Sequence, residues 1–275
     1  MIIQMIVLPT ILSAYKRSLR IGSAGKTAPI NRFFVERIKG SKRLKEFYPN
    51  GLTILTESGT RHLSLKALLD HNICINGRNF GTLKEIEEKA VALLDTSNFV
   101  DTWEICGLGD GHLGNILLSK EKGMNQEYNV LMVDYEISGY HSPFLDLVKP
   151  YYVDVFFAIF FADILSVDNL LQKGLISRLS VDNNCITIDL DINSFLSPHA
   201  LFVRKMNWKG LINPFKKLLS SRLRGDLFMR KQIDTLGAAL FANSIYSRNF
   251  SGRSDVFLAN LALGILLFLE GVHQV

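Results

Sequence analysis

The sequence contains few cysteines, and their positions do not indicate a metal centre or a disulfide framework. The three cysteines, Cys74, Cys106 and Cys185, are odd in number and far apart in a chain of 275 residues. Zinc sites and small disulfide-rich scaffolds need paired cysteines at short, regular spacings. We therefore expect reduced thiols and a cytoplasmic protein, in which Cys106 is a small buried apolar residue.

An uninterrupted apolar run long enough to cross a membrane is also missing. The first eight residues are apolar, but they lack a basic start and a small-residue cleavage site. A longer apolar run, residues 256–269, is interrupted by Asn260 and falls short of the roughly 18 residues that a spanning helix needs. We predict a buried core helix there and no membrane span.

A complete phosphate-binding P-loop is absent as well. Residues 22–27 read Gly-Ser-Ala-Gly-Lys-Thr, which covers only the second half of that pattern. The pattern requires a glycine five residues before Gly25, and Arg20 occupies that position. We expect a flexible connection with a solvated Lys26 instead.

The charge balance gives no indication of a nucleic-acid partner. The net charge is +5, and the composition, 48% hydrophobic and 21% charged, is typical of a globular protein with a sizeable core. Residues 204–231 are strongly basic and contain a single acid, Asp226, but no aromatic pattern for base stacking. This segment favours an anionic small-molecule ligand or, more simply, a solvated helix face. Its basic residues are Arg204, Lys205, Lys209, Lys216, Lys217, Arg222, Arg224, Arg230 and Lys231.

One segment places polar residues in an arrangement that indicates chemistry. Residues 107–117 read Gly-Leu-Gly-Asp-Gly-His-Leu-Gly-Asn-Ile-Leu, and an apolar run over residues 129–133 ends on Asp134. A carboxylate can orient or deprotonate a hydroxyl, and amide and carboxylate oxygens can hold Mg²⁺ on nucleotide phosphates. We predict phosphoryl transfer with Asp110 as the base and Asn115 and Asp134 as Mg²⁺ ligands. The simpler alternative is that these residues cap a turn and end a strand.

These residues resemble the catalytic core of the aminoglycoside phosphotransferase and choline kinase family, which are small-molecule kinases. Residues 110–117 are similar to that family's catalytic run, and residues 133–136, Val-Asp-Tyr-Glu, to its Ile-Asp-Phe-Glu. Leu108 and Leu113 replace a His and a Pro that are frequent in the family. Residues 139–147 are similar to a later family segment, whose aspartate, Asp146 in this chain, would brace the catalytic loop.

The resemblance implies an α+β protein with a protein-kinase-like fold and two lobes. A short or incomplete N-terminal β lobe, residues 1–60, would bind the nucleotide. A mostly helical lobe, residues 61–275, would contain the catalytic loop and the acceptor site. The implied cofactors are ATP and Mg²⁺, the implied partners are ATP and a small-molecule acceptor, and Glu136 would assist the metal or position the acceptor.

Two residues of the N-terminal part are candidates for holding the nucleotide phosphates. In kinase-like folds a strand lysine grips the phosphates and pairs with a helix glutamate. Residues 1–16 are predicted as strand and would present Lys16, while Glu36 would lie on a helix over residues 31–39 that Asn31 caps. The alternatives are a solvated lysine at the end of a strand and an exposed glutamate.

A strand over residues 52–57, a short link and a helix over residues 64–69 are similar to the family's hinge. There Glu57 and Gly59 would contact the adenine. Only about fifty residues precede this hinge, and no glycine-bearing hairpin that would cover phosphates is predicted. The alternative function is therefore a catalytically inactive, kinase-like binding or regulatory module. A protein kinase proper is disfavoured, because no activation segment follows Asp134.

The remaining elements follow from hydrophobic periodicity and turn residues. The sequence predicts a turn at residues 49–51, a helix over 83–94 capped by Thr82, a helix over 151–165, a hairpin over 179–192 and two closing helices over 234–247 and 255–271.

Overall fold

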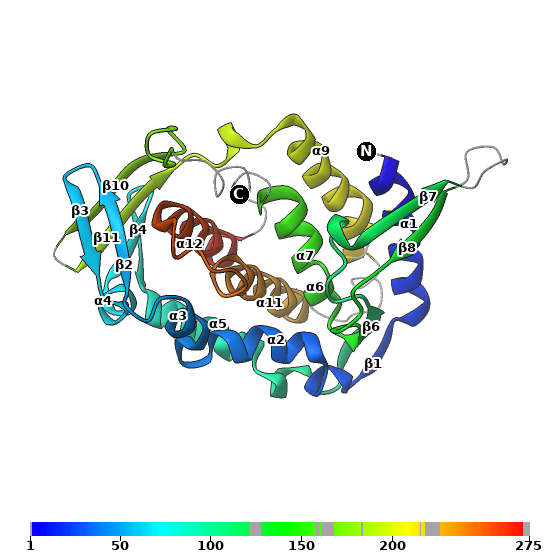
Figure 1. The fold of residues 1–275 in the computed structure, drawn as a ribbon. Helices are drawn as coiled ribbons and strands as arrows, with labels where there is room; N and C mark the ends of the chain where they lie inside the picture. The colour runs from blue at the N-terminus through cyan, green and yellow to red at the C-terminus, as the bar shows by residue number, and fades with distance from the viewer. Residues whose placement is uncertain are drawn as a thin grey trace. The chain divides into compact units, whose positions relative to one another are not determined.

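The structure is a computed structural model, and it describes residues 2–120, 128–157, 160, 168–182, 184–214, 216–217 and 226–271. Helices and strands are mixed along the chain, which confirms the predicted α+β class (Figure 1). The kinase-like fold itself stays a prediction.

The chain packs into two units, each built from three separate stretches. The first unit contains Met1–Phe33, Thr96–Phe157 and Ser197–Gln232, and the second contains Phe34–Asp95, Ala158–Leu196 and Ile233–Val275. This division differs from the predicted boundary at residue 60. The reason is that strands pair over long sequence distances, and local composition does not reveal such pairings.

The first unit contains a three-stranded antiparallel sheet in the order β1-β6-β9. The three strands are β1 Arg20–Gly22, β6 Thr102–Gly107 and β9 Gly139–His141. A separate hairpin, β7 Ile116–Lys120 and β8 Tyr128–Met132, confirms the strand predicted before Asp134. Besides a longer helix at the start of the chain, this unit contains the shorter helices α6 Pro143–Asp146, α7 Val148–Tyr151, the π-helical Tyr152–Phe157 and α9 Pro198–Asn207.

The predicted strand over residues 1–16 is wrong, because Ile2–Ser18 form helix α1. Val7, Ile11 and Tyr15 are four residues apart and all buried, so they form one buried face of a helix. The β-branched residues of this segment favour strand only weakly, and tertiary packing overrides such a preference. Pro9 lies inside the helix and is exposed.

The second unit contains a four-stranded sheet in the order β10-β11-β4-β5. Strands β11 and β4 are parallel, and the two outer pairs are antiparallel. The strands are β4 Asn72–Ile75, β5 Arg78–Thr82, β10 Ile176–Asp182 and β11 Cys185–Leu190. The β10–β11 hairpin confirms the hairpin predicted over residues 179–192.

The helices agree with most of the sequence predictions. They are α2 Pro29–Ile38, α3 Lys42–Phe47, α4 Leu65–Asp70, α5 Leu83–Leu94, α11 Asp226–Ile245 and α12 Ser254–Leu269. Every residue of α12 from Asp255 to Phe268 is buried, which confirms the predicted core helix. No helix in the described ranges is long and apolar enough to cross a lipid bilayer. The helix predicted over residues 151–165 is helical through Phe157, and most of its remainder lies outside the described residues.

Two local predictions need correction. Helix α2 begins at Pro29, so Asn31 lies within its first turn and does not cap it. Residues 59–63, predicted as a link, form strand β3 Gly59–Leu63, which pairs with β2 Leu52–Thr56. The second unit therefore contains a glycine-bearing hairpin that the sequence did not predict.

The cysteines differ in part from the prediction. All three are free, but Cys106 is exposed, because it lies on the opposite face of β6 from the buried Ile105. Cys74 on β4 and Cys185 on β11, although 111 residues apart, place their Sγ atoms 3.0 Å from one another. Strand pairing in the sheet brings these two thiols together.

Candidate active site

The loop after β6 runs beside the segment that follows β8. Gly107 pairs with Gly139 across the β6–β9 ladder. Beyond the ladder, Gly109 has a positive φ of 76°, and a Cβ atom there would lie 2.5 Å from the carbonyl oxygen of Ile137. Only glycine permits this close approach. Asp110, the next residue, therefore lies close to the turn that contains residues 134–138.

Asn115 and Asp134 come together at the open end of the β7–β8 hairpin. Ile116 pairs with Met132, and one step further the Val133 amide donates to the Asn115 carbonyl oxygen at 2.9 Å. The Asn115 Nδ2 atom donates to the backbone carbonyl of Asp110 at 2.9 Å. Since the amide nitrogen is used in this way, the Asn115 Oδ1 atom remains to accept or ligate. These bonds connect Asp110 with Asn115, and Asn115 with Val133, the residue before Asp134; we call Asp110, Asn115 and Asp134 the Asp110 cluster.

Asp134 has an uncommon backbone conformation. Its φ is 66°, in the left-handed region that non-glycine residues rarely adopt, and its side chain is exposed. Within the described part of the chain, its carboxylate makes no hydrogen bond or ion pair. Strained residues of this kind gather at binding sites, where the surrounding structure holds them. The carboxylate is thus presented to solvent beside Asn115.

Asp146 holds the loop after β6 in place through hydrogen bonds, which is the structural role expected for it. Its buried carboxylate accepts hydrogen bonds from the Gly109 amide and from the Tyr15 hydroxyl. The His141 Nε2 atom lies 3.0 Å from Oδ1 of the same carboxylate. Burial raises the pKa of Asp146, but the contacts with His141, Tyr15 and Gly109 outweigh it and lower the pKa below its usual value.

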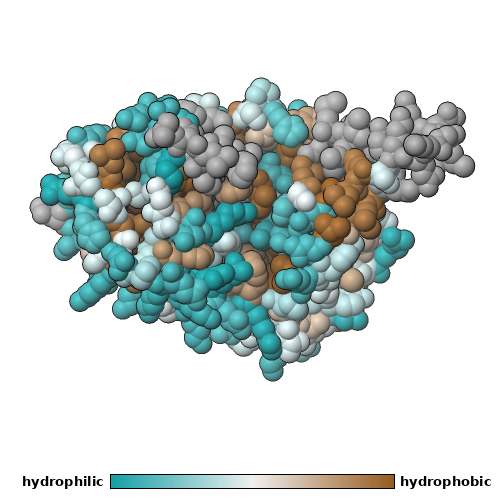
Figure 2. Space-filling view, in the orientation of Figure 1, coloured by the Kyte–Doolittle hydropathy of each residue, from teal (hydrophilic) through white to brown (hydrophobic). Residues whose placement is uncertain are grey.

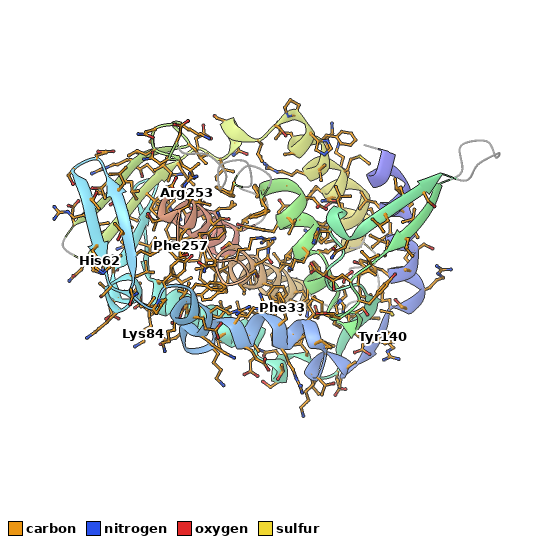
Figure 3. All side chains as sticks on the ribbon, viewed as in Figure 1. Phe33, His62, Lys84, Tyr140, Arg253 and Phe257 are labelled. Atoms are coloured by element: carbon orange, nitrogen blue, oxygen red, sulfur yellow. The ribbon has the colours of Figure 1, made fainter. Side chains whose placement is uncertain are left out.

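Lys149 is a neighbour of Asp110 that the sequence analysis missed. Its Nζ atom lies 3.3 Å from the Asp110 Oδ1 atom, and its side chain is only 8% exposed. The same Nζ atom lies 5.0 Å from the centre of the Phe33 ring, a side chain labelled in Figure 3. Buried lysines are rare unless they are paired. The only signal in the sequence was a lysine within the apolar segment that follows Asp146.

Asp154 is a second residue that the sequence did not reveal. Its carboxylate accepts the Leu113 amide hydrogen at 3.0 and 3.2 Å, which holds the turn just before Asn115. Burial raises the pKa of Asp154 to about 7, and the Leu113 hydrogen bond opposes this rise. Asp154 and Asp146 line a cavity of about 20 Å³ beneath α1, which is large enough for roughly one water molecule.

The hairpin beside the cluster also presents apolar side chains. Leu117 and Leu131 are directly paired across β7 and β8, and they are 51% and 58% exposed. Figure 2 shows hydrophobic residues gathered over this hairpin. The cluster therefore lies next to an apolar surface on the same unit.

Of the candidate nucleotide residues, Glu36 lies on a helix as predicted, whereas Lys16, Glu57 and Gly59 lie in other local structures than predicted. Lys16 is exposed in the last turn of helix α1, so the predicted strand lysine is wrong. Glu36 is exposed on α2 and belongs to the second unit, and its pairing with Lys16 stays a prediction. Glu57 and Gly59 lie at the turn of the β2–β3 hairpin and do not form the predicted strand–link–helix hinge, because the link is itself a strand.

The donor set of the cluster suits Mg²⁺. Among the described residues, no group of three or more His, Cys, Asp or Glu side chains could hold a metal ion alone. Mg²⁺ is commonly bound by one or two protein oxygens together with substrate phosphates and water. The Asn115 amide oxygen and the Asp134 carboxylate are hard oxygen ligands of this kind, so they fit a metal that arrives with a nucleotide.

Comparisons with protein-family models, with curated proteins and with solved structures give no match for this chain. The functional argument therefore depends on the geometry of the cluster and on the chemistry of its side chains.

Proposed function

We propose that this protein is an ATP-dependent phosphotransferase that acts on a hydroxyl group of a small molecule. Asp110 is the base, and Asn115 and Asp134 hold Mg²⁺ on the nucleotide phosphates. The observation that carries the proposal is the hydrogen-bonded connection among these residues. Asn115 contacts Asp110 through its side chain and the residue before Asp134 through its backbone.

Asp110 has an oxygen atom suited to receive a proton. Its Oδ1 atom is buried and accepts no hydrogen bond within the described part of the chain, although Lys149 Nζ lies 3.3 Å away. A buried acceptor without a donor is unfavourable, and an acceptor hydroxyl would satisfy it. Lys149 pairs with the carboxylate and orients it, and orientation is what a catalytic base requires of its neighbours.

The other residues of the cluster hold the geometry. Bound Mg²⁺ would neutralise the phosphate charge, with the Asn115 Oδ1 atom and the Asp134 carboxylate as its protein ligands. His112 accepts the Gly114 amide hydrogen at 3.1 Å through Nδ1, which shapes the turn before Asn115. Asp146 and Asp154 each accept a backbone amide of the loop, so its two ends are held by separate carboxylates.

The basic segment supports an anionic acceptor over a cationic one. Arg204 and Lys205 lie in the last turn of α9, within the first unit. Lys216 places its ammonium group 5.7 Å from the Trp208 ring. Two further residues of this segment, Arg222 and Arg224, lie outside the described residues. Cationic side chains attract phosphate or carboxylate groups and repel aminoglycosides or choline.

Nucleotide binding tests the proposal first. ATP with Mg²⁺ at millimolar concentration should raise the melting temperature, because a ligand that binds the folded state adds stability by mass action. The rise should require Mg²⁺ and disappear in Asp134→Ala. Asp101→Ala is the matched control, because Asp101 is another exposed aspartate of the first unit with positive φ. Loss of the rise in both variants would contradict a specific role for Asp134.

Turnover tests the role of Asp110. With an acceptor found by screening anionic metabolites for ATP consumption, Asp110→Asn should lower kcat by about 10²- to 10⁴-fold, the usual contribution of a general base. The Mg²⁺-dependent melting shift should remain in this variant. Unchanged turnover would exclude Asp110 as the base.

One observation favours the alternative of an inactive, kinase-like binding or regulatory module. Lys16, the candidate for gripping the nucleotide phosphates, lies on a helix and not on a strand. Absence of any melting shift with ATP and Mg²⁺ would support this module and contradict the phosphotransferase.

A further inference from the structure

The second unit contains a large hollow whose lining differs in chemistry from the Asp110 cluster. Its volume is about 770 Å³, within the roughly 300–1,000 Å³ of small-molecule sites. It is lined by the turn between α2 and α3, by α4 and by α5. Gly40 and Ser41 both have positive φ, so the chain bends sharply between the two helices and leaves space beside α5.

The floor of the hollow is apolar, and its one buried charge is already satisfied. Leu65, Leu69 and Val91, which are partly exposed, contribute apolar surface. Glu87 is buried, and its two oxygens accept hydrogen bonds from Ser41, at 2.6 Å, and from the Tyr246 hydroxyl. Burial raises the pKa of Glu87 despite these bonds. Glu87 is therefore a structural group and is not presented to a ligand.

The rim of the hollow is cationic. Lys39, Lys45, Lys66 and Lys84 come from the turn after α2 and from α3, α4 and α5, and all four are exposed. Figure 3 labels Lys84 at the start of α5, and Figure 2 shows mostly hydrophilic residues over α3 and α5.

The fold itself uses these four lysines little, although the Lys45 charge acts to lower the pKa of the buried Glu87 carboxylate. None of them makes an ion pair or a hydrogen bond within the described part of the chain. The exposed acids on the same rim are Asp70 and Glu88, which are fewer than the lysines. Four cations around one hollow repel one another, and an anion placed among them relieves this repulsion.

We propose that this hollow binds a small phosphomonoester that carries an apolar body. Lysine ammonium groups are compact charges that bind phosphate well, and several of them can surround one dianion. The apolar floor would bury the rest of the ligand, as in most small-molecule sites. This site is independent of the proposed phosphoryl transfer, because none of its residues belongs to the Asp110 cluster.

Calorimetric titration of the full chain with 1-naphthyl phosphate tests the proposal. The probe combines a phosphate group with an apolar ring, and its two parts, inorganic phosphate and 1-naphthol, serve as reference ligands. We expect the probe to bind at least ten-fold more tightly than either part. Absence of measurable binding at millimolar probe, or equal affinity for 1-naphthol, would overturn the proposal.

Charge-neutralising variants locate the binding. Lys45→Gln with Lys84→Gln should weaken binding of the probe at least ten-fold. Lys42→Gln with Lys89→Gln is the matched control, since these lysines are exposed on the same two helices but do not line the hollow. Equal weakening in both double variants would show only general charge attraction and would overturn the assigned site.

One further variant separates this site from the nucleotide site. Asp134→Ala should leave binding of the probe unchanged, whereas it should remove the Mg²⁺-dependent effect of ATP. Loss of probe binding in Asp134→Ala would place the probe at the Asp110 cluster and overturn the proposal.

Discussion

Two carboxylates of the first unit, the buried Asp146 and the half-buried Asp154, have pKa values that are shifted in opposite directions. Asp146 contacts an amide, a hydroxyl and a histidine, and together these hold its pKa below the usual value. Among the described residues, Asp154 has only the Leu113 amide as a donor, so burial dominates and raises its pKa to about 7. The number of donors around each carboxylate explains the difference.

Asp154 makes stability depend on pH in a defined direction. The folded pKa of about 7 lies above the usual 3.8, so the native state binds a proton that the unfolded state has released between these values. The free energy of unfolding therefore falls as pH rises between these two pKa values, and the whole of this decrease is present above pH 7. Asp154→Asn removes the charge and should raise the melting temperature at pH 8 but not at pH 4.

The stabilisation by Asp154→Asn at pH 8 should reach at most about 4 kcal/mol, since each pKa unit corresponds to about 1.4 kcal/mol. Asp182→Asn, at an exposed aspartate of β10, is the control and should change the two melting temperatures equally. An equal effect of Asp154→Asn at both pH values would contradict the raised pKa. The acidic groups that share the cavity, Asp146 and Tyr15, are unchanged in this comparison.

At the scale of elements, the predictions succeeded where local signals agreed with one another. Helix α5 has apolar residues at helical spacing and a complete capping box between Thr82 and Glu85. The first eight residues of the chain are apolar except for Gln4, so their sequence did not distinguish helix from strand. Strand β3 has four exposed residues and one buried residue, so it lacks the alternation that identifies a strand.

The capping box of α5 gives a direct test at this scale. Thr82→Ala removes the hydrogen bond from the Glu85 amide to the Thr82 hydroxyl, which is 3.2 Å long. The expected loss is about 1 kcal/mol in the free energy of unfolding, measured by chemical denaturation. Thr82→Ser keeps the hydroxyl and should lose much less. If Thr82→Ala and Thr82→Ser lost the same free energy of unfolding, the effect would come from packing and not from the hydrogen bond.

At the scale of the whole molecule, the two units are interleaved along the chain. The first unit combines α1 and β1 with β6, which lies some eighty residues later, and the Tyr15 hydroxyl contacts Asp146 across 131 residues. A cut at residue 60 would therefore remove parts of both units, including the β2 strand of the second. The predicted division into two lobes at residue 60 stays a prediction that a fragment can test.

We therefore expect a fragment of residues 61–275 not to fold, although it contains the whole Asp110 cluster. Loss of α1 leaves the Asp146 carboxylate buried without the Tyr15 donor and exposes apolar side chains that α1 covers. Circular dichroism of the fragment should show no cooperative melting, whereas the full chain should melt cooperatively. Cooperative melting of the fragment would support the predicted boundary at residue 60.

The sequence by itself determined the elements with strong local signals and the composition of the Asp110 cluster. Asp110 and Asn115 are five residues apart, and Asp134 ends the next hairpin strand, so short-range geometry brings them together. Such contacts depend on turns and adjacent strands, whose residue preferences are local. This is why the motif could be identified before the structure was known.

Only the tertiary structure decided the surroundings of that cluster and the existence of the cationic hollow. Lys149 reaches Asp110 across 39 residues, and Asp154 reaches Leu113 across 41. The lysines of the hollow come from four separate elements. These arrangements depend on which distant segments pack together, and packing is determined by complementary apolar faces over the whole chain and not by any local pattern of residues.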